Sequence, residues 1–291
     1  MPILKISDSH YRKLPDMVWS TMLKNIYEKS DMHISLPVDP KLEEVFKFGT
    51  MAHMSILEPE KFKEVVKEIP EYTPITEEHK KKYMKDGVVN KNYRLTKEYR
   101  DQKIQFEEEN EHTIGPVDMK KLKDMLAATK KSHPKKFDGY LTGGDAEVTI
   151  ALDAFETGVS LPNNEWDVIT TPVKGRLDYV KVIGNTVFIT DYKTCQSASP
   201  RDFPYKVRSM KYDMQAAFYT DIAKQHYGPD YKVVFLWLAQ EKEYPFASKW
   251  YKMSERTYEE GKQRYASVME RADAVIRGGE KIGYGDEVDS L

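Results

Sequence analysis

The sequence predicts an α/β domain, because strand patterns and helix patterns both recur along one long chain. Two patterns indicate strands: a hairpin signal over residues 173–192, and the apolar run 231–240, which is typical of a strand buried on both faces. Helical periodicity indicates the other main elements, at 41–57, 96–110, 117–132, 204–227 and 254–277.

Length and composition indicate a globular protein. The 291 residues are 40% hydrophobic and 12% aromatic, which is enough to bury one large core or two small ones. We expect a single domain over residues 1–291. Its parts would be an N-terminal segment (1–40), a lysine- and glutamate-rich helical insertion (60–140), a core (141–278) and a mobile tail (279–291).

Composition also excludes several classes. The single cysteine, Cys195, rules out an internal disulfide and a cysteine-based zinc or iron–sulfur site. The longest apolar run, 233–239, is too short to span a bilayer, and residues 1–13 lack a signal-peptide pattern, so we expect a cytoplasmic protein with no membrane partner. The net charge of −2 argues against nucleic-acid binding over the whole surface. Basic residues concentrate at 118–136 and 192–211, as local binding faces or as ordinary solvated faces.

The hairpin is the pattern with the clearest chemical content. Runs of β-branched and aromatic residues flank the turn Gly184-Asn185. If these two residues form the loop, antiparallel pairing places Ile183 opposite Thr186. Counting outward from that pair then places Asp178 opposite Asp191.

Two directly opposed carboxylates need a compensating charge. Their Cβ atoms would lie roughly 4.5–5.5 Å apart, and the repulsion at about 5 Å and an effective dielectric near 20 is about 3 kcal/mol. A hard divalent cation with oxygen ligands would offset it. Lys193, two residues after Asp191, would then serve a nucleophilic water or a developing negative charge.

Each of these signals also has a purely structural explanation. Asp-x-Lys recurs at positions 39, 101, 118 and 230, so alone it carries little information, and a solvated hairpin with a chance acid pair is the alternative. His53, in the apolar helix 41–57, would in isolation be a hydrogen-bonded core residue. Glu147, in the strand pattern 146–152, would in isolation be a surface residue.

Six motifs in a fixed order remove much of this ambiguity. They are FGTMAH at 48–53, LEPEKF at 57–62, AEVT at 146–149, GRLD at 175–178, DYKT at 191–194 and QAAFY at 215–219. Over about residues 6–274 the chain resembles the PD-(D/E)xK nuclease superfamily, and within it the phage and prophage exonucleases of the exodeoxyribonuclease VIII (RecE-like) type. The resemblance implies a restriction-endonuclease-like core, with a mixed central β-sheet flanked by helices and a helical insertion.

The resemblance also implies a metal site. Asp178 and Asp191 would bind Mg²⁺, with Mn²⁺ as a substitute, and the carbonyl of Tyr192 would add a ligand. Glu147 would be a catalytic acid that lies near the metals or holds their water. His53 would be a metal ligand or lie beside the metal.

The remaining motif residues would act on the DNA. By the resemblance, Lys193 would orient the attacking water or stabilise the pentacovalent phosphate, and the sequence leaves both roles open. Gln215 and Tyr219, four residues apart on one helix face, would contact the DNA backbone or brace the site. Arg176, beside Leu177 and Asp178, receives no role.

The implied function is that of a Mg²⁺-dependent exodeoxyribonuclease that degrades linear double-stranded DNA from its ends, 5′ to 3′, for phage-type homologous recombination in a bacterial cytoplasm. A ring-shaped homo-oligomer and a single-strand annealing partner are implied as well. Two alternatives stay open: a restriction-type or structure-specific endonuclease on the same fold, and a non-catalytic DNA-binding scaffold. The chain departs from the related CRISPR adaptation nucleases in lacking their cluster of cysteines, and it has no Gly-Lys-Ser/Thr phosphate loop.

Overall fold

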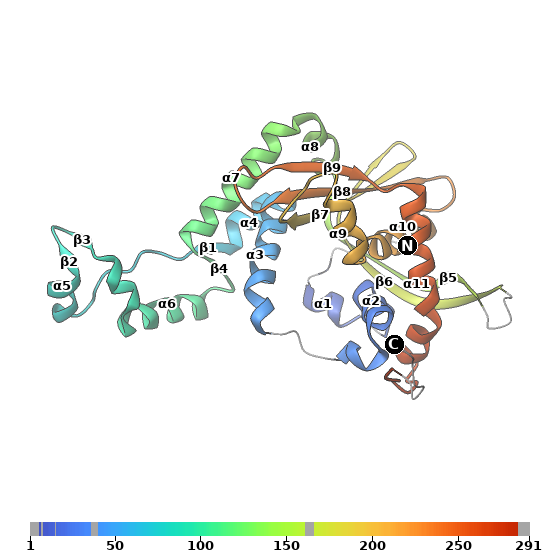
Figure 1. The fold of residues 1–291 in the computed structure, drawn as a ribbon, viewed down its shortest axis with the longest axis horizontal. Coiled ribbons are helices and arrows are strands. Elements are labelled where there is room, and N and C mark those ends of the chain that lie inside the picture. The colour runs from blue at the N-terminus through green and yellow to red at the C-terminus, as the bar shows by residue number, and fades with distance from the viewer. Residues whose placement is uncertain (1–5, 7, 15, 36–39, 161–165, 285–291) are drawn as a thin grey trace. The chain divides into compact units, whose positions relative to one another are not determined.

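A computed structural model describes residues 6, 8–14, 16–35, 40–160 and 166–284. The chain forms two compact units, one of residues 1–43 and 128–291 and the other of residues 44–127 (Figure 1). Among the described helices, none combines the length and apolar character that crossing a bilayer requires. Most of the predicted tail, residues 285–291, lies outside the described residues.

The first unit is built on a five-stranded sheet with the order β5-β6-β7-β8-β9. The β7 and β8 strands pair in parallel, whereas the other three neighbouring pairs are antiparallel. Residues 234–240 of β8 are all buried, as predicted from the apolar run. The sheet is therefore mixed, as expected. Its strands are β5 (Asp145–Ser160), β6 (Trp166–Ile183), β7 (Thr186–Cys195), β8 (Lys232–Glu241) and β9 (Ser248–Lys252).

Two long helices of this unit pack on each other and contact β5 and β6 (Figure 1). They are α10 (Tyr212–Tyr227) and α11 (Glu255–Ile276), and a Cβ atom at Gly261 of α11 would collide with the α10 backbone. The remaining helices are α1 (Asp8–Arg12), α2 (Ser20–Glu28), η1 (Asp31–Ser35), α8 (Pro134–Leu141) and α9 (Phe203–Ser209). This arrangement of a mixed sheet and flanking helices confirms the predicted fold class.

The single helix predicted over 204–227 is wrong, because the structure has two helices there. Between the end of α9 and the start of α10, Lys211 adopts a left-handed conformation with φ 55° and ψ 35°. Its ammonium lies 3.4 Å from a carboxylate oxygen of Glu28. Residues 205–227 contain no glycine or proline, so no local signal marks this break.

The second unit is mostly helical, with two small two-stranded sheets, β1-β4 and β2-β3. Two helices, α3 (Pro40–Leu57) and α7 (Pro116–Ser132), extend across the boundaries between the units. The elements between them are α4 (Pro59–Val65), β1 (Val66–Glu68), α5 (Glu77–Tyr83), β2 (Met84–Lys85), β3 (Val88–Val89), η2 (Lys91–Leu95), α6 (Lys97–Glu109) and β4 (His112–Ile114).

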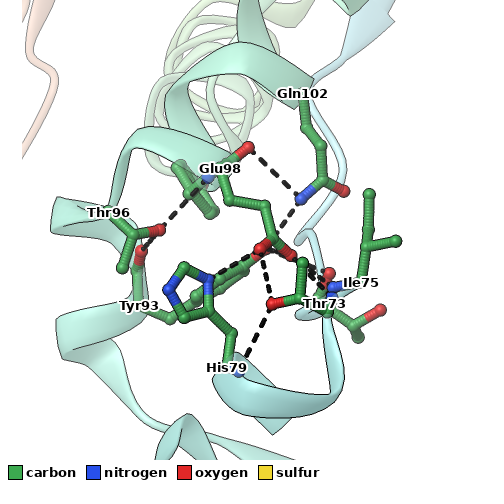
Figure 2. A network of polar contacts seen from close by, with 9 residues as sticks. Thr73, Ile75, His79, Tyr93, Thr96, Glu98 and Gln102 are labelled. Carbon is green, nitrogen blue, oxygen red and sulfur yellow. Dashed lines mark hydrogen bonds and ion pairs between the residues drawn. The ribbon is translucent and has the colours of Figure 1, made fainter.

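A polar network centred on Glu98 connects α5, η2 and α6 in this unit (Figure 2). The Tyr93 hydroxyl, which belongs to a fully buried side chain, donates to Glu98 at 2.9 Å. The Glu98 carboxylate also lies 2.6 Å from His79 Nδ1 and accepts from Ile75 and Thr76. These hydrogen bonds, led by that of the Ile75 amide, lower the pKa of Glu98 to about 2.

Candidate active site

The hairpin of β6 and β7 has the predicted register. Ile183 pairs with Thr186 across the turn, and the ladder runs back to the pair Tyr179 and Thr190. Gly184 in the turn has a φ of 55°, a left-handed conformation that costs glycine little. The hairpin predicted from the sequence is therefore confirmed over these pairs.

The ladder between β6 and β7 ends at Tyr179 and Thr190, although β7 stays paired with β8 as far as Cys195. Asp178 lies at this fork, and its Oδ2 accepts a hydrogen bond from the Tyr192 amide at 2.9 Å. The side chain thus takes the place of a strand partner for that N–H group. Asp178 is thereby held against the DYKT segment of β7.

Glu147 approaches Asp178 from β5, the strand that pairs with β6 on the side away from β7. It lies on β5 between two residues that pair with Tyr179 and Leu177 of β6, the residues on either side of Asp178. Carboxylate oxygens of Glu147 and Asp178 lie within 4.8 Å of each other. Glu147 has a φ of 50°, which is uncommon for a residue with a side chain and concentrates at functional sites. Two acids from distant parts of the chain therefore converge.

Asp191 and Lys193 form a shielded ion pair on β7. The Lys193 Nζ lies 2.9 Å from Asp191 Oδ1, and the two side chains are 15% and 2% exposed. Burial acts to lower the pKa of Lys193, but the charges of Asp191 and Asp178 raise it above its usual value. Lys193 also lies 4.9 Å from the centroid of the Tyr212 ring. The side chain is therefore a protonated ammonium beside the acids.

The donor set fits a hard divalent cation. Two carboxylates with oxygens within 4.8 Å of each other repel by at least about 3 kcal/mol at an effective dielectric near 20. Carboxylate oxygens are also the ligands that Mg²⁺ and Mn²⁺ prefer. Glu147 and Asp178 could hold such an ion between β5 and β6.

The Tyr192 side chain points away from Asp178 and toward Gln240 on β8. Its hydroxyl donates to Gln240 Oε1 on β8 at 2.7 Å, and the ring is buried. Burial raises the pKa of Tyr192 above its usual value. Tyr192 therefore meets Asp178 through its backbone, whereas its side chain packs in the core. The role predicted for its carbonyl group stays a prediction.

The predicted pair Gln215 and Tyr219 lies together on α10. Gln215 Nε2 donates to the Tyr219 hydroxyl at 3.4 Å, which confirms that they share a helix face. The Tyr219 hydroxyl is also 3.1 Å from Ser20 Oγ on α2, and burial raises the pKa of Tyr219. A Cβ atom at Gly175 would come within 3.2 Å of the Tyr219 ring, so glycine there lets α10 approach β6.

Sequence reasoning missed two residues that contact the candidate site. Arg176 Nε lies 2.8 Å from Glu147 Oε2, and its position two residues before Asp178 is the signal that could have found it. Tyr212 meets Lys193, and no local pattern signals that contact. His53 is half-buried on α3 of the second unit, and its role as a metal ligand stays a prediction.

The mixed sheet and the converging acids resemble those of PD-(D/E)xK-like domains. A family model described as a PDDEXK-like domain of unknown function (DUF3799) matches residues 165–291, less than half of the chain. The matched range includes Asp178, Asp191 and Lys193, but it begins after Glu147 and so does not include that residue. No curated protein matches the chain.

One solved structure has a similar fold. A crystal structure described as a "putative exonuclease" from Eubacterium rectale is 14% identical, with a TM-score of 0.56, over 97% of this chain and 90% of its own. The structure of SSO0001 is 16% identical over 62% of this chain and 69% of its own, and its TM-score of 0.28 is too low to support an argument. The family match indicates a PDDEXK-like domain over residues 165–291, and the likeness to the solved structure concerns the fold.

Proposed function

We propose that the protein is a divalent-metal-dependent deoxyribonuclease that degrades linear double-stranded DNA from its ends. The convergence of Glu147 and Asp178 within 4.8 Å, next to the fork between β6 and β7, carries this proposal. A divalent cation at the reacting phosphate promotes phosphodiester hydrolysis, and these acids offer a place for one.

Each residue of the site has a role in this mechanism. Asp178, Glu147 and Asp191 would hold Mg²⁺, or Mn²⁺ as a substitute, with the Tyr192 carbonyl and His53 as further ligands. The bound cation would supply an activated water and neutralise charge on the phosphate. Lys193, held beside Asp191, would orient the attacking water or stabilise the negative charge that develops on the phosphate.

The more detailed properties rest on resemblance. Attack from DNA ends agrees with the description of the structural neighbour from Eubacterium rectale. The 5′ to 3′ direction, a ring-shaped homo-oligomer and a single-strand annealing partner for phage-type recombination in the cytoplasm follow from the likeness to RecE-type exonucleases. Gln215 and Tyr219 would contact the DNA backbone or brace the site beside Ser20.

The decisive experiment digests linear duplexes labelled at the 5′ or the 3′ end, with and without Mg²⁺, beside a covalently closed circle. Early release of the 5′ label, only with Mg²⁺ and only from the linear DNA, is the expected result. Cleavage of the closed circle would instead indicate an endonuclease. DNA binding without cleavage under any divalent ion would indicate a scaffold and overturn the proposal.

A further inference from the structure

Arg176 of β6 is a cation in direct contact with one of the site acids. Its Nε lies 2.8 Å from Glu147 Oε2, and the two side chains are only 17% and 28% exposed. Shielding from solvent strengthens an ion pair of this kind compared with one on an open surface. The contact therefore constrains where the Glu147 carboxylate can lie.

The N-terminal segment holds Arg176 from another side. The guanidinium carbon lies 5.8 Å from the centroid of the Tyr11 ring, and Nη2 lies 3.5 Å from the carbonyl oxygen of Ile6. The segment is fastened to β6 by hydrogen bonds between Val18 and the backbone of residues 172 and 174. A guanidinium already held by a ring and a carbonyl oxygen loses less freedom when it binds a carboxylate.

Lys174 strengthens this attachment two residues earlier on β6. Its buried ammonium donates to the carbonyl oxygens of Tyr11 and Leu14 at 3.3 and 3.4 Å. It also lies 5.2 and 5.6 Å from the centroids of the Tyr11 and Trp19 rings. Tyr11 is thus positioned by Lys174 and available to support Arg176.

Glu147 needs such support for two reasons. Its backbone has a φ of 50°, and its carboxylate is within 4.8 Å of the Asp178 carboxylate, which repels it. Without an opposing cation, the Glu147 side chain would gain by turning away from Asp178. A guanidinium whose Nε lies 2.8 Å from Glu147 Oε2 offsets the repulsion and favours one position of the carboxylate.

We propose that Arg176, which lies within cation–π distance of Tyr11, is a positioning residue that holds the Glu147 carboxylate toward Asp178, so that both acids can share one divalent cation. This inference rests on the metal site of the proposed function. The N-terminal segment thereby contributes to the site, because Tyr11 contacts the guanidinium of Arg176.

Calorimetric titration with Mn²⁺ alone tests the proposal, with Arg176→Gln compared to the wild-type protein. A positioning role predicts binding weaker by about tenfold or more, as for other residues that orient metal ligands. Simple electrostatics predicts the opposite sign, because the substitution removes a positive charge near the cation. Binding of Mn²⁺ that is unchanged or tighter in Arg176→Gln would overturn the proposal.

Two further variants keep the test decisive. Lys181→Gln removes an equal charge from β6, at a side chain whose ammonium contacts the carbonyl of Asp138, and should leave Mn²⁺ binding unchanged. Tyr11→Leu should weaken binding several-fold, and it decides the question if circular dichroism shows that Arg176→Gln does not fold.

If the wild-type protein binds no Mn²⁺, the proposed metal site itself fails and the role of Arg176 fails with it. Wild-type binding with an unaffected Arg176→Gln refutes the inference alone.

Discussion

The surroundings of the carboxylates differ between the two units. Glu98 of the second unit is 14% exposed and is surrounded by neutral hydrogen-bond donors and His79 (Figure 2). In the first unit, Glu147 and Asp178 lie within 4.8 Å of each other, with Arg176 and Lys193 as neighbouring cations. The first arrangement satisfies a charge, whereas the second brings like charges together.

This difference separates a structural acid from a chemical one. Donors around Glu98 lower its pKa to about 2, so its negative charge stabilises the fold at neutral pH. The repulsion between Glu147 and Asp178 lowers the stability of the fold. The protein trades this stability for the ability to bind a cation there. Neutralising an acid should therefore reduce activity in one region and stability in the other.

The largest effect is expected for Asp178→Asn. The asparagine oxygen can still accept the hydrogen bond from the Tyr192 amide, but the ligand charge is lost and the repulsion with Glu147 disappears. We expect DNA degradation to fall by at least about a thousandfold. The melting temperature should stay the same or rise. Nuclease assays and thermal unfolding measure the two effects.

The matched control is Asp273→Asn. It removes the charge of an aspartate on α11 that forms an ion pair with Arg277, the residue just after that helix. It should leave nuclease activity near the wild-type level. A strong loss of stability in Asp178→Asn would show that this acid is structural, and the contrast with Glu98 would not hold.

The second effect is expected for Glu98→Ala, which removes the acceptor shared by Tyr93, Thr76 and the Ile75 amide. The buried Tyr93 hydroxyl and the exposed Ile75 and Thr76 donors would lose this partner, so the second unit should open locally. Hydrogen exchange should become faster in peptides from residues 72–102 and stay unchanged in β6 and β7. Glu60→Ala, at an exposed ion pair with Lys63 in the same unit, should change neither.

Acid should produce a smaller and graded version of this loss. The pKa of Glu98 in the folded protein, about 2, lies below its ordinary value of 4.5. The unfolded state therefore takes up the proton first, and the stabilisation is complete above about pH 4.5 and is lost as the pH falls toward 2. The protection of residues 72–102, measured relative to the intrinsic exchange rate at each pH, should fall over this window. Protection that does not change with pH would contradict the assigned role of Glu98.

The smallest effect is expected for Tyr192→Phe. The substitution removes the hydrogen bond from the hydroxyl to Gln240 but leaves the Tyr192 amide that Asp178 binds. We expect a loss of about 1 kcal/mol in the free energy of unfolding, with nuclease activity retained. Denaturant titration and the end-release assay check both parts. Lost activity in this variant would mean that the phenol acts in the site.

Local patterns predicted β7, β8, the hairpin part of β6 and the first half of β5, but not β9 or the four short strands of the second unit. They also predicted the long helices, apart from the break at Lys211. The Gly184-Asn185 turn and the alternation around it indicate both the hairpin and its register, because each depends on residues close in the chain. The helix break at Lys211 could not be predicted, since a non-glycine residue adopts the left-handed conformation there. The contact of Lys193 with Tyr212 was equally hidden.

The sequence by itself determined the α/β class, the hairpin and the order of the acids along the chain, because period-two alternation and turn residues act over short distances. Only the tertiary structure decided that Glu147 meets Asp178 and that Arg176 lies between Glu147 and Tyr11. Such contacts join segments far apart in the chain, and the packing of β5 and the N-terminal segment against β6 selects them.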